Sequence, residues 1–442
     1  MVRKVENPFK EQGIPSWIRY LVTGLTGFFV AYYLFAGNGG SSEENELSFR
    51  QESNPRLRPG QQEVGVDDIV AEHQNDDFVE PEEDSESGDE MDPFPSLDQG
   101  DFLDWIRNYY NELKFESKPK QDKLNKPMLM ESLQRGCDFM VANQKDAGNF
   151  NYQYDFVTKK MDEDDSPVRQ AGALWGITLC FNHMPGNPMY RSTVERGIAF
   201  FRDHMVDGPV EGSNMLKYPG YDESPSGANA LYGLALIDYI RTIEDQKLPG
   251  CNDHEYCDDI QKVKENLAKT IKFLRYMQND NLHFSKEYWF EDEEKSNESS
   301  PYYDGEILLC LIRAAKNMEG YFELLEIIME AAPVLAKTYT LDAWRTDEHD
   351  SDQTKGFYQW ASMAYTEYYF DALENFEDFG DLVLALAHWI IHTHGILDRN
   401  RNTGYAFEGI LSAYRIAQAR NNTDALSELS YVVHEGLYKL GR

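Results

Sequence analysis

Five times along the chain, a long loop rich in aromatic and acidic residues precedes a segment rich in small and apolar residues. The first copy runs from Gly148 to Gly176 and contains Ser166 and Pro167, a pair typical of a helix N-cap and first turn. The later copies continue into helical segments that begin near residues 227, 305, 357 and 405. A repeat of about 50 to 75 residues predicts stacked helical hairpins, because one hairpin alone cannot bury its apolar face.

From about Asp101 onward the sequence is helical in pattern. Apolar residues recur at spacings of three and four, as at Ile260, Val263 and Leu267, and no run shows the alternation of a β-strand. The fold class is therefore predicted to be all-α. The expected helices are 101–113, 127–143, 167–183, 188–205, 227–244, 257–279, 303–318, 321–339, 357–374, 379–393, 404–420 and 423–440.

Links between these helices alternate between long and short. In an up-and-down helical array every second link lies on the same face, so the long links share one face, which we call the mouth. Long loops in compact domains are usually functional. The helix after each long link is rich in Gly and Ala, which suits an inner ring, and residues 101–442 are therefore predicted to form an α/α toroid. The long links fall at about 144–166, 206–226, 280–302, 340–356 and 394–403.

An apolar run over residues 20–37 precedes this domain, and a helix of about 18 such residues spans a bilayer. Basic residues such as Arg3 and Lys4 lie before the run, whereas acidic residues begin soon after it at Glu43. The positive-inside bias then predicts a cytosolic tail at 1–19 and the rest of the chain across the membrane. A signal peptide cleaved just after the run is the alternative.

Between the anchor and the domain lies a strongly acidic segment, assigned to residues 38–100. Residues 41–101 contain 20 Asp or Glu and only 3 Arg. Such a composition buries too little apolar surface to offset its ordering entropy, so a disordered acidic stem is expected. The formal net charge of the whole chain is -35, which disfavours a nucleic-acid partner because phosphate binding needs excess Lys and Arg.

The helix pattern resembles the six-hairpin, or (α/α)6, toroids of many glycosidases, polysaccharide lyases and sugar epimerases. Terpenoid cyclases and prenyltransferases share this class, and two segments, FMVANQKDAGNF (139–150) and FLRYMQNDNLHF (273–284), are similar to degenerate forms of their Gln-Asp-Gly-aromatic repeat. The resemblance extends over about residues 120–440 and includes no diagnostic motif. It implies a carbohydrate-active enzyme, with a terpenoid or prenyl-type enzyme as an alternative.

A column of polar residues is expected at the start of the inner helices. Superposing the five helices by their small and aromatic positions places one polar side chain of each in the first turns, beside free backbone N–H groups. These side chains would form a hydrogen-bonding floor to the mouth, although first turns favour Glu, Gln and Asn in any case. The column consists of Gln170, Asn229, Glu306, Gln359 and Glu408.

Acid and base catalysis requires titratable groups within reach of one substrate bond. We expect Asp304 and Glu306 to face Glu408 across the ring, with Asp222 and Glu223 as the next candidates. Aromatic rings of the same loops offer flat faces for a sugar, and an arginine there is suited to a substrate carboxylate. The predicted substrate-binding residues outside the column are Arg169, Tyr152, Tyr221, Tyr302, Tyr303 and Tyr405.

The densest acidic cluster of the domain is Asp162 to Asp165. Its Asp-x-Asp-Asp order resembles the proton donor of class II terpene cyclases, but a solvated loop explains it better, as a turn explains the calcium-loop pattern at 398–404. No metal site is predicted, because His392 and His394 are two residues apart and point to different sides of a helix. Phosphate-loop and Rossmann motifs are absent from the sequence, and no cofactor is predicted.

Two kinds of covalent modification follow from a lumenal position. A disulfide is expected between Cys251 and Cys257, which are separated by five residues that include Asn252. The remaining cysteines lie among apolar helix residues and are predicted to be buried free thiols: Cys137, Cys180 and Cys310. The sequons at Asn297 and Asn421 are expected to be glycosylated.

Together these features predict a single-pass type II membrane protein of the Golgi, the ER or the cell surface. Its lumenal toroid would act on a carbohydrate by hydrolysis, elimination or epimerisation. A non-catalytic toroid that binds glycan or protein partners is the main alternative.

Overall fold

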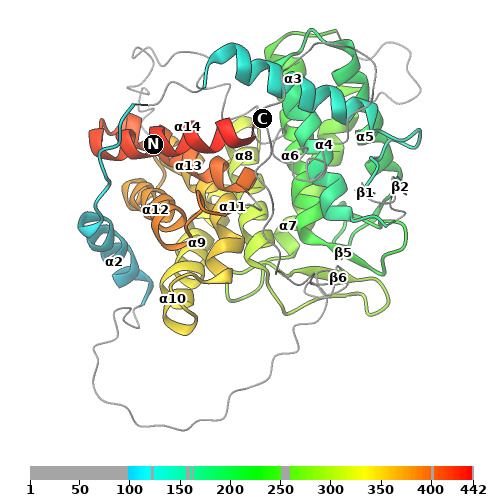
Figure 1. Cartoon of the computed structure of the whole chain (residues 1–442). Coiled ribbons are helices and arrows are strands. Elements are labelled where there is room, and N and C mark those ends of the chain that lie inside the picture. Colours follow the sequence, from blue (N-terminus) through cyan, green and yellow to red (C-terminus); the bar gives the residue numbers. More distant parts are fainter. Residues whose placement is uncertain are drawn as a thin grey trace, which may run out of the picture. The chain divides into compact units, whose positions relative to one another are not determined.

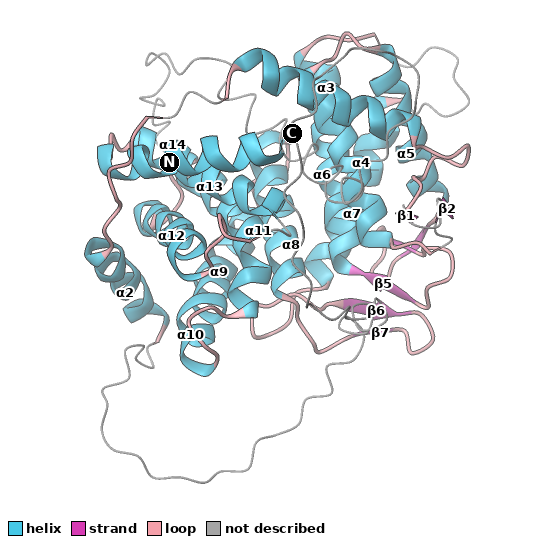
Figure 2. Cartoon of the chain, in the orientation of Figure 1, coloured by secondary structure: helices cyan, strands magenta, loops and turns pink. Residues whose placement is uncertain are grey.

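The computed structural model describes residues 98–120, 124–155, 160–161, 164–249, 259–399 and 403–440. These segments are mainly helical, and their short strands lie in the connections between helices (Figure 2). The predicted tail, membrane anchor and nearly all of the stem lie outside the described residues. Within the described ranges, no helix combines the length and the apolar character needed to cross a membrane.

Each expected helix is present, with bounds shifted by a few residues. The helices are α2 (Gln99–Glu112), α3 (Lys126–Ala142), α4 (Pro167–His183), α5 (Pro188–Asp203), α6 (Ser226–Asp245), α7 (Ile260–Tyr276), α8 (Pro301–Asn317), α9 (Leu324–Lys337), α10 (Ala343–Thr346), α11 (Asp352–Phe370), α12 (Phe376–His388), α13 (Thr403–Ala419) and α14 (Thr423–Leu440). Single π-helical turns at Thr338–Asp342 and Trp389–Thr393 extend α9 and α12.

Inner and outer helices alternate as predicted for an α/α toroid. The inner helices α4, α6, α8, α11 and α13 pack successively side by side (Figure 1). Outside them, α5 packs on α4, α7 on α6, α9 on α8, and α12 on both α11 and α13. Every inner helix begins directly after one of the long links. The long links and the inner ring predicted from the sequence are therefore confirmed.

The first helix of the domain packs outside this ring. α2 lies against α12 and α9, and Arg107 of α2 forms an ion pair with Asp378 of α12 at 2.7 Å. The following extended segment runs along α14, where the N–H groups of Glu116 and Lys118 donate to Glu428 (2.9 Å) and Ser427 (3.0 Å). The segment thus connects the two ends of the helical array before α3 begins.

Large side chains and one ion pair fill the centre between the inner helices. Trp175 of α4 lies 5.9 Å from Trp360 of α11, measured between ring centroids. Trp175 Nε1–H donates to Asp238 of α6 at 2.8 Å, and Arg313 of α8 forms an ion pair with the same carboxylate at 2.8 Å. At the level of these residues, the space between the inner helices is a packed core with a polar centre.

Short strands occur in the mouth connections, although the sequence predicted none. They are too short to show an alternating pattern. The strands are β1 (Tyr154–Asp155), β2 (Lys160–Met161), β3 (Met205–Asp207), β4 (Asn214–Leu216), β5 (Glu223–Pro225), β6 (Glu287–Trp289) and β7 (Glu294–Lys295). β1 pairs with β2, β3 with β4, and β5, β6 and β7 form an antiparallel sheet in that order.

One prediction about the cysteines is wrong. Cys137 of α3 and Cys180 of α4 form a disulfide, with a Cα–Cα distance of 5.9 Å and 43 residues between them in sequence. Both cysteines lie on apolar helix faces that pack against each other. The apolar sequence context predicted that they are buried, but not that they lie close enough to form a bond. Cys310 is a buried free thiol, as predicted. Cys251 and Cys257 lie outside the described residues.

We expect peptide mapping of the unreduced protein to show a linked pair of peptides that contain Cys137 and Cys180. The variant C137S/C180S should lose about 2–4 kcal/mol of unfolding free energy, because the unfolded chain regains its freedom. Cys310 is an internal control, since it should react with an alkylating agent only after unfolding. Alkylation of Cys137 and Cys180 in the native protein without reduction would contradict the pairing.

Candidate functional site

Three polar side chains at the start of inner helices anchor the preceding loops. Gln170 Oε1 accepts from the N–H of Phe150 at 2.8 Å, and Asn229 Oδ1 accepts from the N–H of Leu216 at 3.0 Å. In α8 the corresponding bond runs from the N–H of Phe284 to Asp304 at 2.7 Å. An antiparallel bridge closes each of the two repeat-like segments, Gln144 to Phe150 and Gln278 to Phe284. The predicted floor column is thus partly a set of loop anchors.

Asp304, predicted as catalytic, is fully buried in a hydrogen-bond network. Its carboxylate accepts from Tyr339 OH at 2.6 Å and lies 2.6 Å from His283 Nδ1, in addition to the Phe284 N–H. Each carboxylate oxygen is therefore occupied by groups of the protein. These contacts make Asp304 a loop anchor, as Gln170 and Asn229 are, and the predicted roles of the three residues toward a substrate stay predictions.

Glu306 differs from these anchors. Only 2% of its surface is exposed, and its buried Oε2 has no hydrogen-bond partner among the described residues. A Cβ placed on Gly227, at the start of α6, would overlap this oxygen and the ring of Tyr303. Glu306 therefore lies beneath Tyr303 and against the first turn of α6. Burial raises the pKa of Glu306 well above its ordinary value, which favours the protonated carboxyl.

The sheet β5–β6–β7 brings further carboxylates to this place. Glu223 pairs with Trp289 and Pro225 with Glu287 in the antiparallel register, so Glu223, Glu287 and Trp289 share one face. The opposite face carries buried Ser224 and Tyr288 and packs toward the helices. The acidic face is consequently the one directed toward solvent.

Tyr303 connects the sheet with Glu306. Burial raises its pKa, and the charges of Glu306, Glu287, Glu223 and the neighbouring Tyr221 add to that effect. Partial burial also raises the pKa of Glu287. The charge of Lys286 lowers this pKa, whereas the charge of Glu223 raises it. Tyr303 thus lies within electrostatic reach of the other four groups. We call the five residues the mouth cluster: Tyr221, Glu223, Glu287, Tyr303 and Glu306.

Asp165 organises the other edge of the mouth. Its carboxylate accepts from Gln170 Nε2 at 2.6 Å and from Tyr218 OH at 2.7 Å, and its carbonyl accepts from Tyr221 OH at 2.8 Å. The prediction of a solvated acidic loop is therefore wrong for Asp165, because these bonds fix it in place. Asp162 and Glu163 lie outside the described residues.

Other predicted residues surround the cluster at the surface. Arg169 is exposed and donates a hydrogen bond to the hydroxyl of Tyr152. Its guanidinium also lies over the Tyr152 ring, 5.1 Å from the ring centroid. Tyr302 is 49% exposed. Asp222 is exposed, and its backbone carbonyl accepts from the N–H of Phe290 at 3.1 Å.

Glu408 is a second buried acid, but it is separate from the mouth cluster. It accepts a hydrogen bond from Gln359 and lies near Tyr358 and Tyr405, between α11 and α13. Burial raises the pKa of Glu408 to about 8, opposed by the hydrogen bond from Gln359. Glu408 bonds Gln359 of α11, whereas Glu306 lies against Gly227 of α6. The convergence of the two carboxyls as an acid and base pair stays a prediction.

Glu408 should make stability depend on pH. Its pKa rises from 4.5 to about 8 on folding, so between these values the folded chain keeps a proton that the unfolded chain loses. The contribution to stability is complete below pH 4.5 and falls as pH rises toward 8, by up to about 1.4 kcal/mol per unit. We expect E408Q, which stays neutral, to lose less unfolding free energy than wild type between pH 5 and pH 8 in urea titrations. Equal losses would contradict a buried neutral Glu408.

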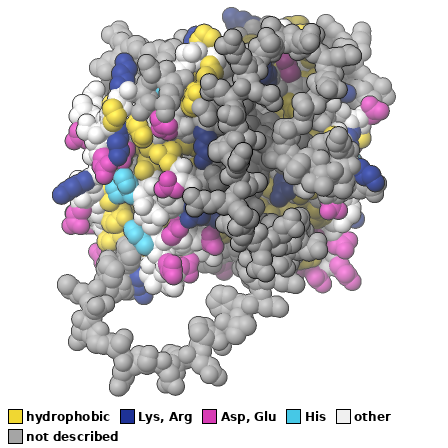
Figure 3. Space-filling model, in the orientation of Figure 1, with side chains coloured by type: hydrophobic (Ala, Val, Ile, Leu, Met, Phe, Trp, Pro, Cys, Tyr) yellow, Lys and Arg dark blue, Asp and Glu magenta, His cyan; other side chains and the backbone are white. Residues whose placement is uncertain are grey.

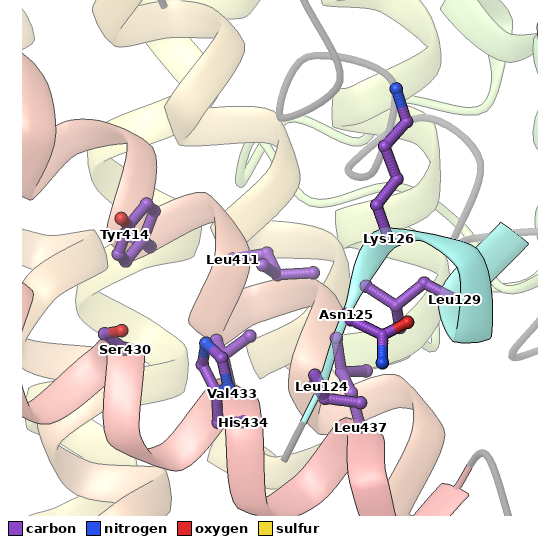
Figure 4. Close-up of a pocket in the computed structure, with 10 residues that line it drawn as sticks. All are labelled: Leu124, Asn125, Lys126, Leu129, Leu411, Tyr414, Ser430, Val433, His434 and Leu437. Carbon is purple, nitrogen blue, oxygen red and sulfur yellow. The ribbon is translucent and has the colours of Figure 1, made fainter. Parts of the chain in front are cut away.

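A cavity of about 110 Å³ lies away from the mouth cluster, between the start of α3 and the helices α13 and α14 (Figure 4). No member of the mouth cluster lines it. In the close-up, the side chain of Lys126 points away from the other lining residues. The lining is mainly apolar and consists of Leu124, Asn125, Lys126, Leu129, Leu411, Tyr414, Ser430, Val433, His434 and Leu437. In the part of the chain that is described, no three His, Cys, Asp or Glu residues are grouped so as to hold a metal ion.

Sequence reasoning named Glu223, Glu306, Tyr221 and Tyr303 but missed Glu287. The proximity of Glu287 to Glu223 depends on the register of β5 and β6, and neither strand has a recognisable sequence pattern. The only available signal was the neighbouring Trp289, which belongs to the aromatic residues of the same loop. The long loop was thus identified, but the residue was not.

Comparisons with known proteins give distant similarities in structure alone. No protein-family profile matches the sequence, and no curated protein matches it. An inactive variant of an alpha-1,6-mannanase of glycoside hydrolase family 76 from Salegentibacter sp., in complex with alpha-1,6-mannotetrose, is 10% identical, covers 77% of this chain and 100% of its own, and has a TM-score of 0.40. A family 76 mannosidase from Bacteroides thetaiotaomicron is 8% identical over 73% and 99% of the two chains, with a TM-score of 0.46.

A D-mannose isomerase is 11% identical, covers 73% of this chain and 86% of its own, and has a TM-score of 0.46. These proteins belong to the toroid class that the sequence predicted. At such values they identify neither a family nor an activity for this chain.

Proposed function

We propose that the protein is a carbohydrate-active enzyme of the toroid type that uses acid and base catalysis at its mouth. One observation carries the proposal: Glu223 and Glu287 share one face of the sheet with Trp289, and Tyr303 lies within electrostatic reach of both carboxyls and of Glu306. Pairs of carboxyls with different pKa values are what glycoside hydrolysis and related proton transfers require.

The roles follow from the environments. Burial raises the pKa of Glu306 and favours its protonated form, which suits Glu306 to the role of general acid. Glu287 and Glu223, on the solvent face of the sheet, supply the base. Trp289 and Tyr302 are 38% and 49% exposed and offer flat faces to a sugar ring. Tyr303 and Glu306 lie side by side against Gly227 of α6.

A non-catalytic toroid that binds a glycan or a protein remains the second candidate. The packed centre favours it, since Trp175, Trp360 and the ion pair of Asp238 with Arg313 leave the ring filled at mid-height. A terpenoid enzyme is less well supported, because an apolar substrate would have to enter through the carboxyls of the mouth cluster.

Activity tests should use full-length protein and a panel of neutral, amino and acidic oligosaccharides, with products detected by mass spectrometry. G227A is the decisive variant, because the added methyl group would displace Glu306 and Tyr303. G186A is its matched control, since a Cβ there meets nothing within 4 Å. Activity in wild type and G186A but not in G227A supports the enzyme. Binding without turnover in all three favours the non-catalytic toroid.

We further propose that the domain lies in the lumen of the secretory pathway, as a type II membrane protein. Two features support this: the disulfide Cys137–Cys180 requires an oxidising compartment, and the sequon residues Asn297 and Asn421 are both exposed. We expect the domain to resist protease added to sealed microsomes, and N297Q to remove one glycan detectable by endoglycosidase digestion. Digestion of the domain in sealed vesicles would place it in the cytosol.

A further inference from the structure

We propose that the mouth cluster selects a positively charged glycan, of the class of glucosamine oligosaccharides with free amino groups. The inference rests on the proposed function and names the substrate class of the same site. Acidic side chains stand at the lower right of Figure 3, on the side where β5 and β6 lie in Figure 1, as well as elsewhere on the face shown.

Negative groups outnumber the available positive ones around the cluster. The nearby cations are Lys295, whose Nζ donates at 2.9 Å to the carbonyl of Tyr276, and Lys286, which lies 3.9 Å from Glu298 and within electrostatic reach of Glu287. Arg169 is held by Tyr152. A uronic acid would therefore meet mainly like charge at the sheet, whereas an ammonium group would meet opposite charge.

Glu306 provides a second observation at the mouth cluster. Its Oε2 is buried, lacks a hydrogen-bond partner among the described residues and lies against Tyr303 at the inner side of the cluster. A buried polar atom without a partner is costly, and such atoms in native proteins usually await a ligand, water or ion. A hydroxyl or ammonium donor of the substrate would satisfy it.

The arrangement favours an organic cation over a metal ion. The carboxyls are spread around a tyrosine, and no metal-binding group of three is formed by the described residues. The exposed ring of Trp289 lies on the same sheet face as Glu223 and Glu287. An ammonium group on a sugar can use both the carboxylates and the aromatic face, through cation–π attraction.

The test is calorimetric titration of the full-length protein with three tetrasaccharides: of glucosamine, of N-acetylglucosamine and of galacturonic acid. Binding of the glucosamine tetramer should be about tenfold tighter than that of its N-acetylated form and should weaken with added salt. Galacturonate should bind weakest. E223Q and E287Q should each reduce the preference for the amine, whereas E330Q, at an exposed position on outer helix α9, should retain it.

The outcomes separate this inference from the proposed function. Equal binding of the amine and its N-acetylated form, or tighter binding of galacturonate, overturns the inference and leaves a carbohydrate-active mouth. Failure of every saccharide to bind or react overturns the proposed function as well. The salt dependence of wild type requires no variant, so it decides the question even if E223Q or E287Q fails to fold.

Discussion

Replacing Glu306 by glutamine should lower the turnover number for the glycan substrate by about 100- to 10,000-fold, the range of a lost general acid. The amide has the shape of the carboxyl but lacks the proton to donate. Because burial favours the neutral form of Glu306 and the amide has a similar shape, E306Q should change the unfolding free energy little. Turnover is measured from product formation, and folding from the thermal midpoint.

E408Q is the matched control for E306Q. Both positions carry a buried glutamate with a raised pKa, but only Glu306 belongs to the mouth cluster. We therefore expect E408Q to keep most of the activity. Equal activity of E306Q and wild type would make Glu306 a structural residue, and equal losses in both variants would indicate a general effect of changing buried acids.

The helix order was predictable because its signals are local. Small residues occur where α6 packs tightly: Cβ atoms at Gly227 and Gly233 would overlap side chains of α8. The alternation of long and short links then fixed which helix ends share the mouth. Proline and N-cap signals also placed the start of α4 at Pro167. These features depend on residues that are close together in sequence, so they can be recognised from one sequence alone.

The candidate site was predictable only in part, because its contacts are between distant segments. Asp304 and Glu306 are both acidic, lie two residues apart in α8 and are both buried, yet only Asp304 accepts the loop N–H of Phe284. Nothing in the sequence distinguishes these roles. The disulfide between Cys137 and Cys180 and the approach of Glu287 to Glu223 likewise depend on packing and on strand register.

Replacing Arg313 by methionine should lower the free energy of unfolding by about 3–5 kcal/mol, the cost of leaving a buried charge without its partner. Asp238 is 1% exposed and Arg313 7% exposed at their side chains, and their ion pair of 2.8 Å joins α6 to α8. Trp175 Nε1–H would remain as an uncharged donor to Asp238, and Arg241, 32% exposed at its side chain, would remain 3.5 Å from the other carboxylate oxygen. Urea titration of R313M and wild type measures the loss.

A double variant distinguishes the loss of the ion-pair partner from the loss of side-chain packing. D238L/R313M removes both charges, so it should be less destabilised than R313M alone, because hydrophobic replacements of a buried pair are often tolerated. R135A is the surface control: its partner Glu131 is 64% exposed, and the loss should stay within about 0.5 kcal/mol. If R313M and the double variant lose the same free energy, then Arg313 stabilises the ring through its contact with the Trp175 ring at 5.8 Å and not through the charge of Asp238.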